Sequence, residues 1–130
     1  MDFGTKNVGL ATTDELGVVI RPLPSIPNLN RRNLLQRLTA IIKELKIEIV
    51  VVGHPINMNG SSGEPVARVE RFVNQVRAAV GLRVKTVDER LSTVEAAEIW
   101  KTMSARRQRK YRTLDSLAAA LILERFLGEE

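Results

Sequence analysis

Three aspartates stand where a carboxylate could take part in phosphoryl chemistry. Asp2 precedes a flexible turn at Gly4, Asp88 follows an apolar run, and Asp115 opens the last apolar segment of the chain. Clustered carboxylates repel one another unless cations compensate, and hard divalent ions prefer oxygen ligands. If the three acids meet, they predict a site for Mg²⁺ or Mn²⁺ that activates a water against a phosphodiester.

Each aspartate alone also has an ordinary explanation. Asp2 could belong to a turn, Asp88 could form a surface ion pair, and Asp115 could complement the dipole of a helix. The three together favour the metal site more strongly than any one of them. Glu89 is the alternative ligand from its strand, because successive strand residues face opposite sides.

The composition is that of one globular domain with an anionic partner. The 130 residues carry 20 Lys and Arg against 15 Asp and Glu, a net charge of +5. This balance favours nucleic acid, and a generally basic surface is the alternative. The chain has no Cys, no apolar run long enough to cross a membrane and no signal peptide, so we expect a cytoplasmic protein without a membrane partner.

The hydropathy pattern predicts alternating strands and helices. Strands are expected at residues 8–13, 18–21, 47–52 and 83–87, after a first strand that ends at Asp2. Helices are expected at residues 31–45, 64–80, 93–103 and from residue 113 onward. The prolines at positions 22, 24 and 27 should exclude regular structure before the first helix.

The order of these elements predicts a single α/β domain over residues 1–130. Residues 47–52 form a β-branched run typical of a strand buried on both faces, and strand–helix–strand connections are parallel and right-handed. We therefore expect a five-stranded mixed sheet in the order 3-2-1-4-5, with strand two antiparallel and helices on both flanks. The strands that end in Asp2 and Asp88 then meet at one edge. Because only Met1 precedes Asp2, we expect the first strand to be truncated at the N-terminus.

Basic and amide side chains are expected to contact nucleic acid around the same edge. Residues 106–112 hold five basic residues and Tyr111 but almost no core-forming residue, which predicts a mobile loop that orders on the substrate. A base could stack on Tyr111, and a solvated charged loop is the alternative. The polar segment 56–63 follows a central strand, where α/β proteins usually bind ligands. The candidate contacts are Lys6, Asn57, Asn59, Arg90, Arg106, Arg107, Arg109, Lys110, Tyr111 and Arg112.

Four segments of the chain resemble, in order, the YqgF/RuvX family of ribonuclease H-like proteins. They are residues 2–9, 51–60, 88–93 and 115–123, and the similarity covers nearly the whole chain. The resemblance implies a ribonuclease H-like fold and a nuclease site formed by Asp2, Asp88 and Asp115. The chain departs from the family pattern at Asn7, at His54 and in lacking apolar residues before Asp2.

The resemblance also implies an activity, because the family is described as pre-16S rRNA nucleases and Holliday-junction resolvases. We expect a hydrolase, dependent on a divalent metal, that processes the 5′ end of pre-16S rRNA in ribosome biogenesis as a monomer or weak homodimer. Two alternatives are a resolvase of branched DNA in recombination and repair, which needs two active sites, and a non-catalytic assembly factor that binds nucleic acid. The D-x-G-T turn also occurs in actin-like ATPases, but those need a second domain for which this chain is too short.

Overall fold

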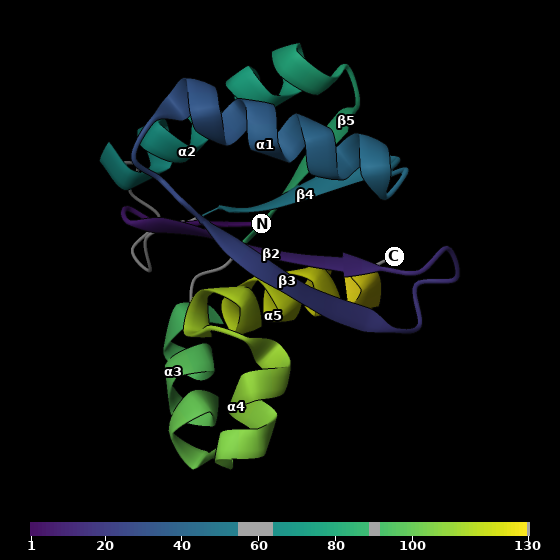
Figure 1. Cartoon of the computed structure of the whole chain (residues 1–130). Coiled ribbons are helices and arrows are strands. Elements are labelled where there is room, and N and C mark those ends of the chain that lie inside the picture. Colours follow the sequence, from purple (N-terminus) through teal and green to yellow (C-terminus); the bar gives the residue numbers. More distant parts are fainter. Residues whose placement is uncertain (55–63, 89–91, 130) are drawn as a thin grey trace.

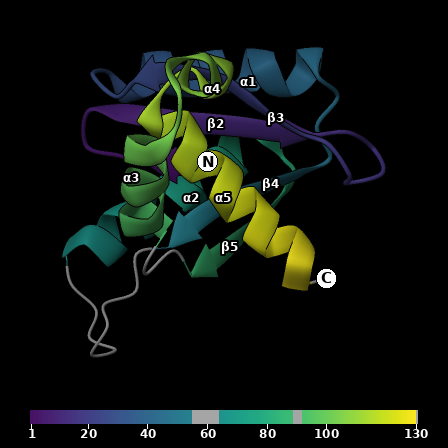
Figure 2. The same cartoon turned by 90° about the horizontal axis from the view of Figure 1, so that it is seen from below.

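The strands form the central layer of the molecule, with helices on both sides (Figure 1). The computed structural model describes residues 1–54, 64–88 and 92–129. Helices α1 (Arg31–Glu44) and α2 (Glu64–Val80) cover one side of the strands. Helix α5 (Leu114–Glu129) crosses the other side, and α3 (Ser92–Thr102) and α4 (Ala105–Tyr111) pack beside it (Figure 2). The predicted α/β class is confirmed, with five strands and five helices in these ranges.

The strands pair in two sheets rather than in the single sheet that the sequence predicts. Strands β1, β2 and β3 are antiparallel in the order β1-β2-β3, and β4 is parallel to β5. The strands are β1 (Asp2–Phe3), β2 (Asn7–Thr13), β3 (Ile20–Pro27), β4 (Ile49–His54) and β5 (Arg83–Asp88). The expected continuous order 3-2-1-4-5 is therefore wrong as a strand pairing.

Met1 lies between the two sheets. Its amino group donates a hydrogen bond to the carbonyl of Val51 (2.6 Å), and its carbonyl accepts one from the amide of Gly53 (3.0 Å). Because β1 has two residues, this contact with β4 does not extend into a ladder. The position of β1 beside β4 agrees with the prediction, although the pairing does not.

Strand β3 includes Pro22, Pro24 and Pro27, so the prediction of irregular structure here is wrong. The strand lies at the edge of its sheet and pairs with β2. At an edge, every second backbone nitrogen points away from the ladder, and a proline there removes no hydrogen bond. The apolar side chains of β3 still reach the core, where Ile26 is 1% exposed.

The four helices that the sequence predicts are confirmed as α1, α2, α3 and α5, with small shifts at their ends. The Asn30 side chain caps α1 by accepting a hydrogen bond from the amide of Asn33 (3.0 Å). Gly81 follows α2 with φ 67°, a conformation that glycine adopts without strain. Among the described residues, no helix is long and apolar enough to cross a membrane.

Residues 105–111 form α4, so the prediction of a mobile loop over 106–112 is wrong. The Ser104 side chain caps the helix by accepting from the amide of Arg107 (3.3 Å). The Gln108 side chain donates to the carbonyl of Trp100 in α3 (2.7 Å). Arg, Gln and Lys are good helix formers, so their charge does not prevent a helix whose other side rests on α3 and α5.

Alternation along the strands separates two packing faces. On the face covered by α1 and α2, Phe3 of β1 stacks on Phe72 of α2, with ring centroids 4.0 Å apart. On the opposite face, Val51 of β4 and Val87 of β5 pack with Ile122 of α5. A side chain's place along a strand therefore decides which helices it meets.

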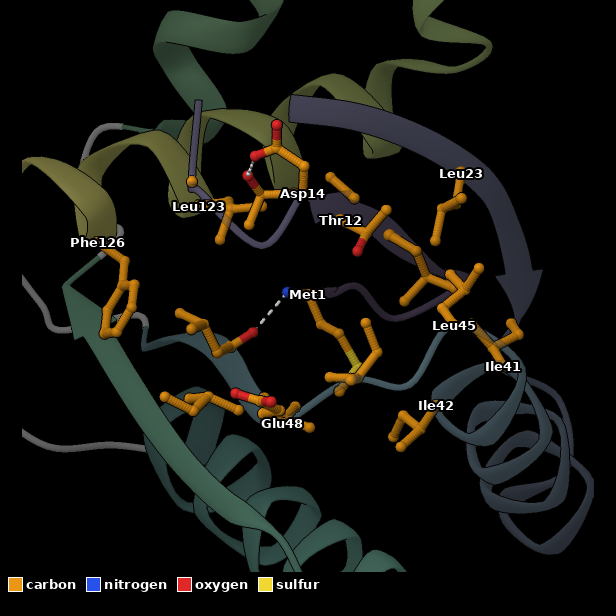
Figure 3. A pocket seen from close by; sticks show the side chains of 18 of the residues that line it. Met1, Thr12, Asp14, Leu23, Ile41, Ile42, Leu45, Glu48, Leu123 and Phe126 are labelled. Carbon is orange, nitrogen blue, oxygen red and sulfur yellow. Dashed lines mark hydrogen bonds between the residues drawn. The ribbon is translucent and has the colours of Figure 1, made fainter. Parts of the chain in front are cut away.

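A cavity of about 950 Å³ lies between the sheets around Met1 (Figure 3). Its wall includes apolar side chains from the end of α1, among them Ile41 and Ile42, and from α5, among them Leu123 and Phe126. The cavity reaches the amino ends of β4 and β5. It is thus at the opposite end of these strands from the expected carboxylates.

Candidate active site

The first turn of α5 sits directly on Gly9 of β2. A Cβ at this position would lie 2.0 Å from the carbonyl oxygen of Asp115 and 3.1 Å from the Asp115 Cβ. A Cβ at these distances would overlap the Asp115 backbone, so only glycine lets the two backbones approach this closely. The contact determines where Asp115 meets the sheet.

Asp2 lies directly opposite Gly9 in the antiparallel pairing of β1 with β2. Opposite residues in such a pair project to the same face, so Asp2 projects to the face on which α5 packs. The stacking of the next residue, Phe3, on α2 agrees with this alternation. Asp2 and Asp115 therefore share one face of the sheet around Gly9.

Hydroxyl groups anchor the start of α5 to the edge strand. Thr113 caps the helix by accepting from the amide of Ser116 (3.0 Å), and the fully buried Ser116 hydroxyl donates to the carbonyl of Leu23 (2.6 Å). The hydroxyl oxygens of Ser25 and Thr113 are 2.8 Å apart. Ser25 lies at a β-bulge where two residues of β3 face Gly9, and bulges commonly redirect side chains in this way.

Burial raises the pKa of the Asp115 carboxyl above its usual value. The first turn of a helix favours a negative charge, but desolvation dominates here. A carboxylate that is costly to ionise in the free protein gains more from a nearby cation than a fully solvated one. This property suits a metal ligand.

Asp88 ends β5, but alternation does not direct its side chain to the α5 face. It pairs in register with His54 of β4, whose Nε2 lies 3.4 Å from Glu70 Oε1 of α2. Residues opposite each other in register project to one face, so Asp88 belongs to the α2 face. The Asp88 carbonyl accepts a hydrogen bond from Arg125 (2.6 Å), in the second half of α5.

The predicted cluster of three carboxylates is not present as a ready metal site. Within residues 1–54, 64–88 and 92–129, no group of three or more His, Asp or Glu side chains is placed to hold a metal ion. The alternative ligand Glu89 lies outside the described residues, as do Asn57, Asn59 and Arg90. The convergence of Asp2, Asp88 and Asp115 therefore stays a prediction.

The basic candidates that the structure describes are exposed to solvent. Lys6 is exposed in the turn between β1 and β2, and the basic side chains of α4 are exposed as well. Tyr111 is half-buried and packs against the cluster that α3 and α5 form around Ala96 and Leu117. Its ring would have to leave this cluster to stack on a base. The exposed residues are Arg106, Arg107, Arg109, Lys110 and, just after the helix, Arg112.

The cavity around Met1 is a separate feature. Its lining does not include Asp2, Asp88 or Asp115. The candidate site at the start of α5 is therefore distinct from this cavity.

Comparison with known proteins resolves the family. The family model described as “RuvX: Holliday junction resolvase” matches residues 1–129. The chain belongs to the RuvX family. It is 39% identical over 132 residues to a protein of Geobacillus kaustophilus (strain HTA426), an alignment that covers 100% of this chain and 96% of the relative. This membership confirms the resemblance seen in the four sequence segments.

Two further relatives agree in length and similarity. A protein of Lachnospira eligens is 37% identical over 130 residues, with 98% of this chain and 93% of the relative covered. A protein of Clostridioides difficile (strain 630) is 35% identical over 127 residues, with 98% and 90% covered. All three relatives carry the name “Putative pre-16S rRNA nuclease”. The match of the RuvX chain to each is close to end to end.

The residues that position the RuvX aspartates were not singled out from the sequence. Gly9 lies inside a predicted strand, which is a signal for close backbone approach. Thr113, three residues before Ser116 and ahead of an apolar run, is a helix-start signal. Neither pattern indicates which helix approaches which strand, so the contact between Gly9 and α5 could be identified only from the structure.

Replacing Gly9 with Ala should destabilise the protein, because the methyl group overlaps the Asp115 backbone and α5 must move. We expect a loss of about 1–3 kcal/mol or more in the free energy of unfolding, measured by urea denaturation. The matched control is Gly128→Ala, where a Cβ meets nothing within 4 Å and a small gain is expected in a helix. Equal stability of the Gly9 variant and the parent would contradict the contact.

Asp115→Asn should stabilise the folded protein at neutral pH. Because folding raises the pKa of Asp115 above its ordinary 3.8, the folded state loses stability as the pH rises from the unfolded pKa through the raised pKa. The urea midpoint of the Asp115→Asn variant should exceed that of the parent at about pH 7. The two midpoints should be equal at about pH 3, below the unfolded pKa.

Asp14→Asn provides a control of opposite sign. A hydrogen bond from the Val18 amide leads the contacts that lower the pKa of Asp14, so this carboxylate stabilises the folded state above its unfolded pKa and less as the pH falls. The Asp14 variant should lose stability at neutral pH. An Asp115 variant that is less stable than the parent at neutral pH would contradict the burial argument.

Proposed function

We propose that this RuvX protein is a metal-dependent nuclease that hydrolyses phosphodiester bonds in structured nucleic acid, with the 5′ end of pre-16S rRNA as its substrate. The observation that carries the proposal is the packing of Asp115 on Gly9, directly opposite Asp2. This arrangement keeps two carboxylates on one face of the sheet, and Lys6 and Arg112, near Asp2 and Asp115 in the chain, are exposed. The names of the relatives support the choice of substrate.

The donor set suits a hard divalent cation. Asp2 and Asp115 would hold Mg²⁺ or Mn²⁺ together with a third carboxylate from the end of β5. The third ligand would be either Glu89 or Asp88, and the Asp88 side chain would have to turn from the α2 face around the end of the strand. Such an ion, when bound, supplies an activated water and stabilises charge on the leaving oxygen. The protein's own contribution is orientation, since the Thr113–Ser116 network holds α5 on the sheet. The raised pKa of Asp115 makes a bound cation a favourable replacement for a proton.

We infer further that the two sheets work as one surface of ribonuclease H-like order 3-2-1-4-5. The two backbone hydrogen bonds of Met1 with β4 support this arrangement. In that order, β1 and β5 flank β4, and their carboxyl ends lie at one edge. Carboxylates of β1 and of the end of β5 would then lie at the same edge as Gly9.

The exposed basic residues of α4 would guide the substrate to this edge. Arg112 connects α4 to Thr113, the cap of α5, so the basic surface adjoins Asp115 in the chain. Each Lys or Arg that neutralises a phosphate contributes to salt-dependent affinity. Tyr111 is assigned a packing role in the free protein because its ring contacts the α3–α5 cluster.

The family description supports a second substrate, the four-way DNA junction. Symmetric cleavage of a junction needs two active sites and hence a dimer, whereas trimming of an RNA end needs one. The two substrates share the phosphodiester chemistry, so one assay can compare them.

Cleavage of labelled pre-16S leader RNA and of a four-way junction, with Mg²⁺, Mn²⁺ or EDTA, tests the function. Asp2→Asn and Asp115→Asn should each lower the rate on the order of 100-fold or more, because an ion contributes several kcal/mol of charge stabilisation. Comparing Asp88→Asn with Glu89→Gln identifies the third ligand by the larger loss.

The matched control for this assay is Glu124→Gln. Glu124 is an exposed acid on α5, so its variant has the same change in charge and should cleave like the parent. Full activity of the Asp2 or Asp115 variant, or cleavage that is unaffected by EDTA, would contradict the proposed function.

A further inference from the structure

The face opposite Asp2 carries arginines stacked on aromatic rings. The guanidinium carbon of Arg31 lies 5.0 Å from the ring centroid of Phe3 and 5.5 Å from that of Phe72. The guanidinium carbon of Arg68 lies 5.2 Å from the centroid of Phe3. Cation–π contacts of this kind hold a guanidinium in a defined orientation. Two arginines from different helices are therefore fixed over one aromatic pair.

The same place concentrates positive charge. Burial, followed by the positive charges of Arg68 and Arg71, lowers the pKa of Arg31. Arg68 and Arg71 are three residues apart on α2, so they are neighbours on the helix surface and repel each other. Within the part of the chain that the structure describes, Arg31 and Arg68 form no ion pair. The protein thus holds positive charges close together, and no described carboxylate pairs with Arg31 or Arg68.

One donor in this group is buried without a partner. Arg31 Nε has no hydrogen-bond partner among the described residues, although its Nη1 donates to the side chain of Gln75. A buried donor left unpaired and a group of like charges both cost free energy. An anion bound beside these arginines would offset the repulsion between their charges and accept hydrogen bonds from their guanidinium groups.

The arginines lie close to the proposed active-site edge. The amide of Asn28, just before α1, donates to the carbonyl of Lys6 (2.8 Å), and the Asn28 side chain donates to the carbonyl of Gly4 (2.9 Å). These bonds tie the start of α1 to the β1–β2 turn. Phe3 is adjacent to Asp2 in β1 and faces the opposite way. The thickness of one sheet therefore separates the arginines from the carboxylates.

We propose that Arg31, Arg68 and Arg71 form a second phosphate-binding site, which holds the sugar–phosphate backbone of the nucleic acid on the α1–α2 face. This inference rests on the proposed function. The planar guanidinium matches phosphate oxygens in a bidentate manner and is weakly hydrated. A substrate that contacts both faces must pass around the edge at the β1–β2 turn, where Lys6 is exposed. Folded or branched nucleic acid meets this requirement better than a short single strand.

The test compares RNA binding by variants in EDTA, where no cleavage occurs. The variant Arg68→Gln/Arg71→Gln leaves Arg31 on the aromatic pair and should weaken binding of a labelled RNA hairpin by roughly 10-fold or more. The slope of log Kd against log salt should fall by about 0.7–0.9 for each phosphate that the variant no longer neutralises. The matched control is Arg37→Gln/Arg83→Gln, which removes two exposed arginines elsewhere and should leave affinity and slope nearly unchanged.

Two further variants keep the result decisive. Arg68→Lys/Arg71→Lys keeps the charge but removes the bidentate geometry, so it should retain the salt slope and bind with intermediate affinity. If the Gln variant unfolds, the Lys variant carries the test, and binding equal to the parent overturns the proposal. Arg106→Ala/Arg107→Ala/Arg109→Ala on α4 is an independent reference. If it flattens the slope while the Arg68/Arg71 variant does not, the second site is overturned and the proposed function stands.

Inorganic phosphate separates this site from the nuclease function. In low salt, phosphate should raise the Tm of the parent but not that of the Arg68→Gln/Arg71→Gln variant. If the parent binds neither RNA nor junction DNA, the proposed function fails. If phosphate then raises both melting temperatures equally, or neither, the anion site fails as well. If phosphate discriminates the variants while RNA binding does not, the site binds a free anion, and the backbone assignment is overturned.

Discussion

The structure around the candidate site depends on the absence of a side chain at Gly9. An α-helix normally rests on a sheet through side chains on both elements. At Gly9 the backbone of α5 itself meets the strand. A polar network at Thr113, Ser116 and Ser25 then holds that turn at the β-bulge of the edge strand. The consequence is a carboxylate, Asp115, delivered to the same face as Asp2.

This placement has an energetic cost that the chemistry can use. Desolvation raises the pKa of Asp115, so the folded protein holds a carboxyl group that a cation can stabilise. Functional sites often keep groups that reduce stability in the free protein. The short strand β1 adds a second consequence, because alternation sends Asp2 to the α5 face and Phe3 to the α1–α2 face. Two residues of one strand thereby link the carboxylates to the arginines on the other side.

Much of the fold follows from local patterns in the sequence. The cap at Asn30, the glycine after α2, the β-branched run of β4 and the apolar stripe of α2 all predicted elements close to those observed. The third strand was predicted at residues 18–21, but its continuation to Pro27 was missed. Prolines are excluded from central strands but tolerated at an edge, and edge position is a tertiary property. Helix α4 was missed because a charged segment has no apolar stripe, and its support comes from α3 and α5.

Candidate residues for the site could be chosen from the sequence, but their geometry could not. The sequence identifies Asp2, Asp88 and Asp115 as acids at element ends, yet the side on which each projects depends on strand register. A shift of one residue reverses that side, and the register of Asp88 with His54 assigns it to the α2 face. The contact between Gly9 and α5 joins parts of the chain that are distant in sequence, so no local pattern could indicate it.

The most direct test of the account is the position of a bound divalent ion in solution. Mn²⁺ broadens the NMR signals of nearby amides, and an ¹⁵N-labelled sample titrated with substoichiometric Mn²⁺ reports which residues lie beside it. The account predicts that the amides of Gly9, Asp115 and Ser116 broaden first, that excess Mg²⁺ restores them, and that Asp115→Asn abolishes the effect. Broadening centred on acids elsewhere, such as Asp14, or signals at Gly9 that Mn²⁺ leaves unchanged, would contradict the claim that Asp2 and Asp115 form the metal site.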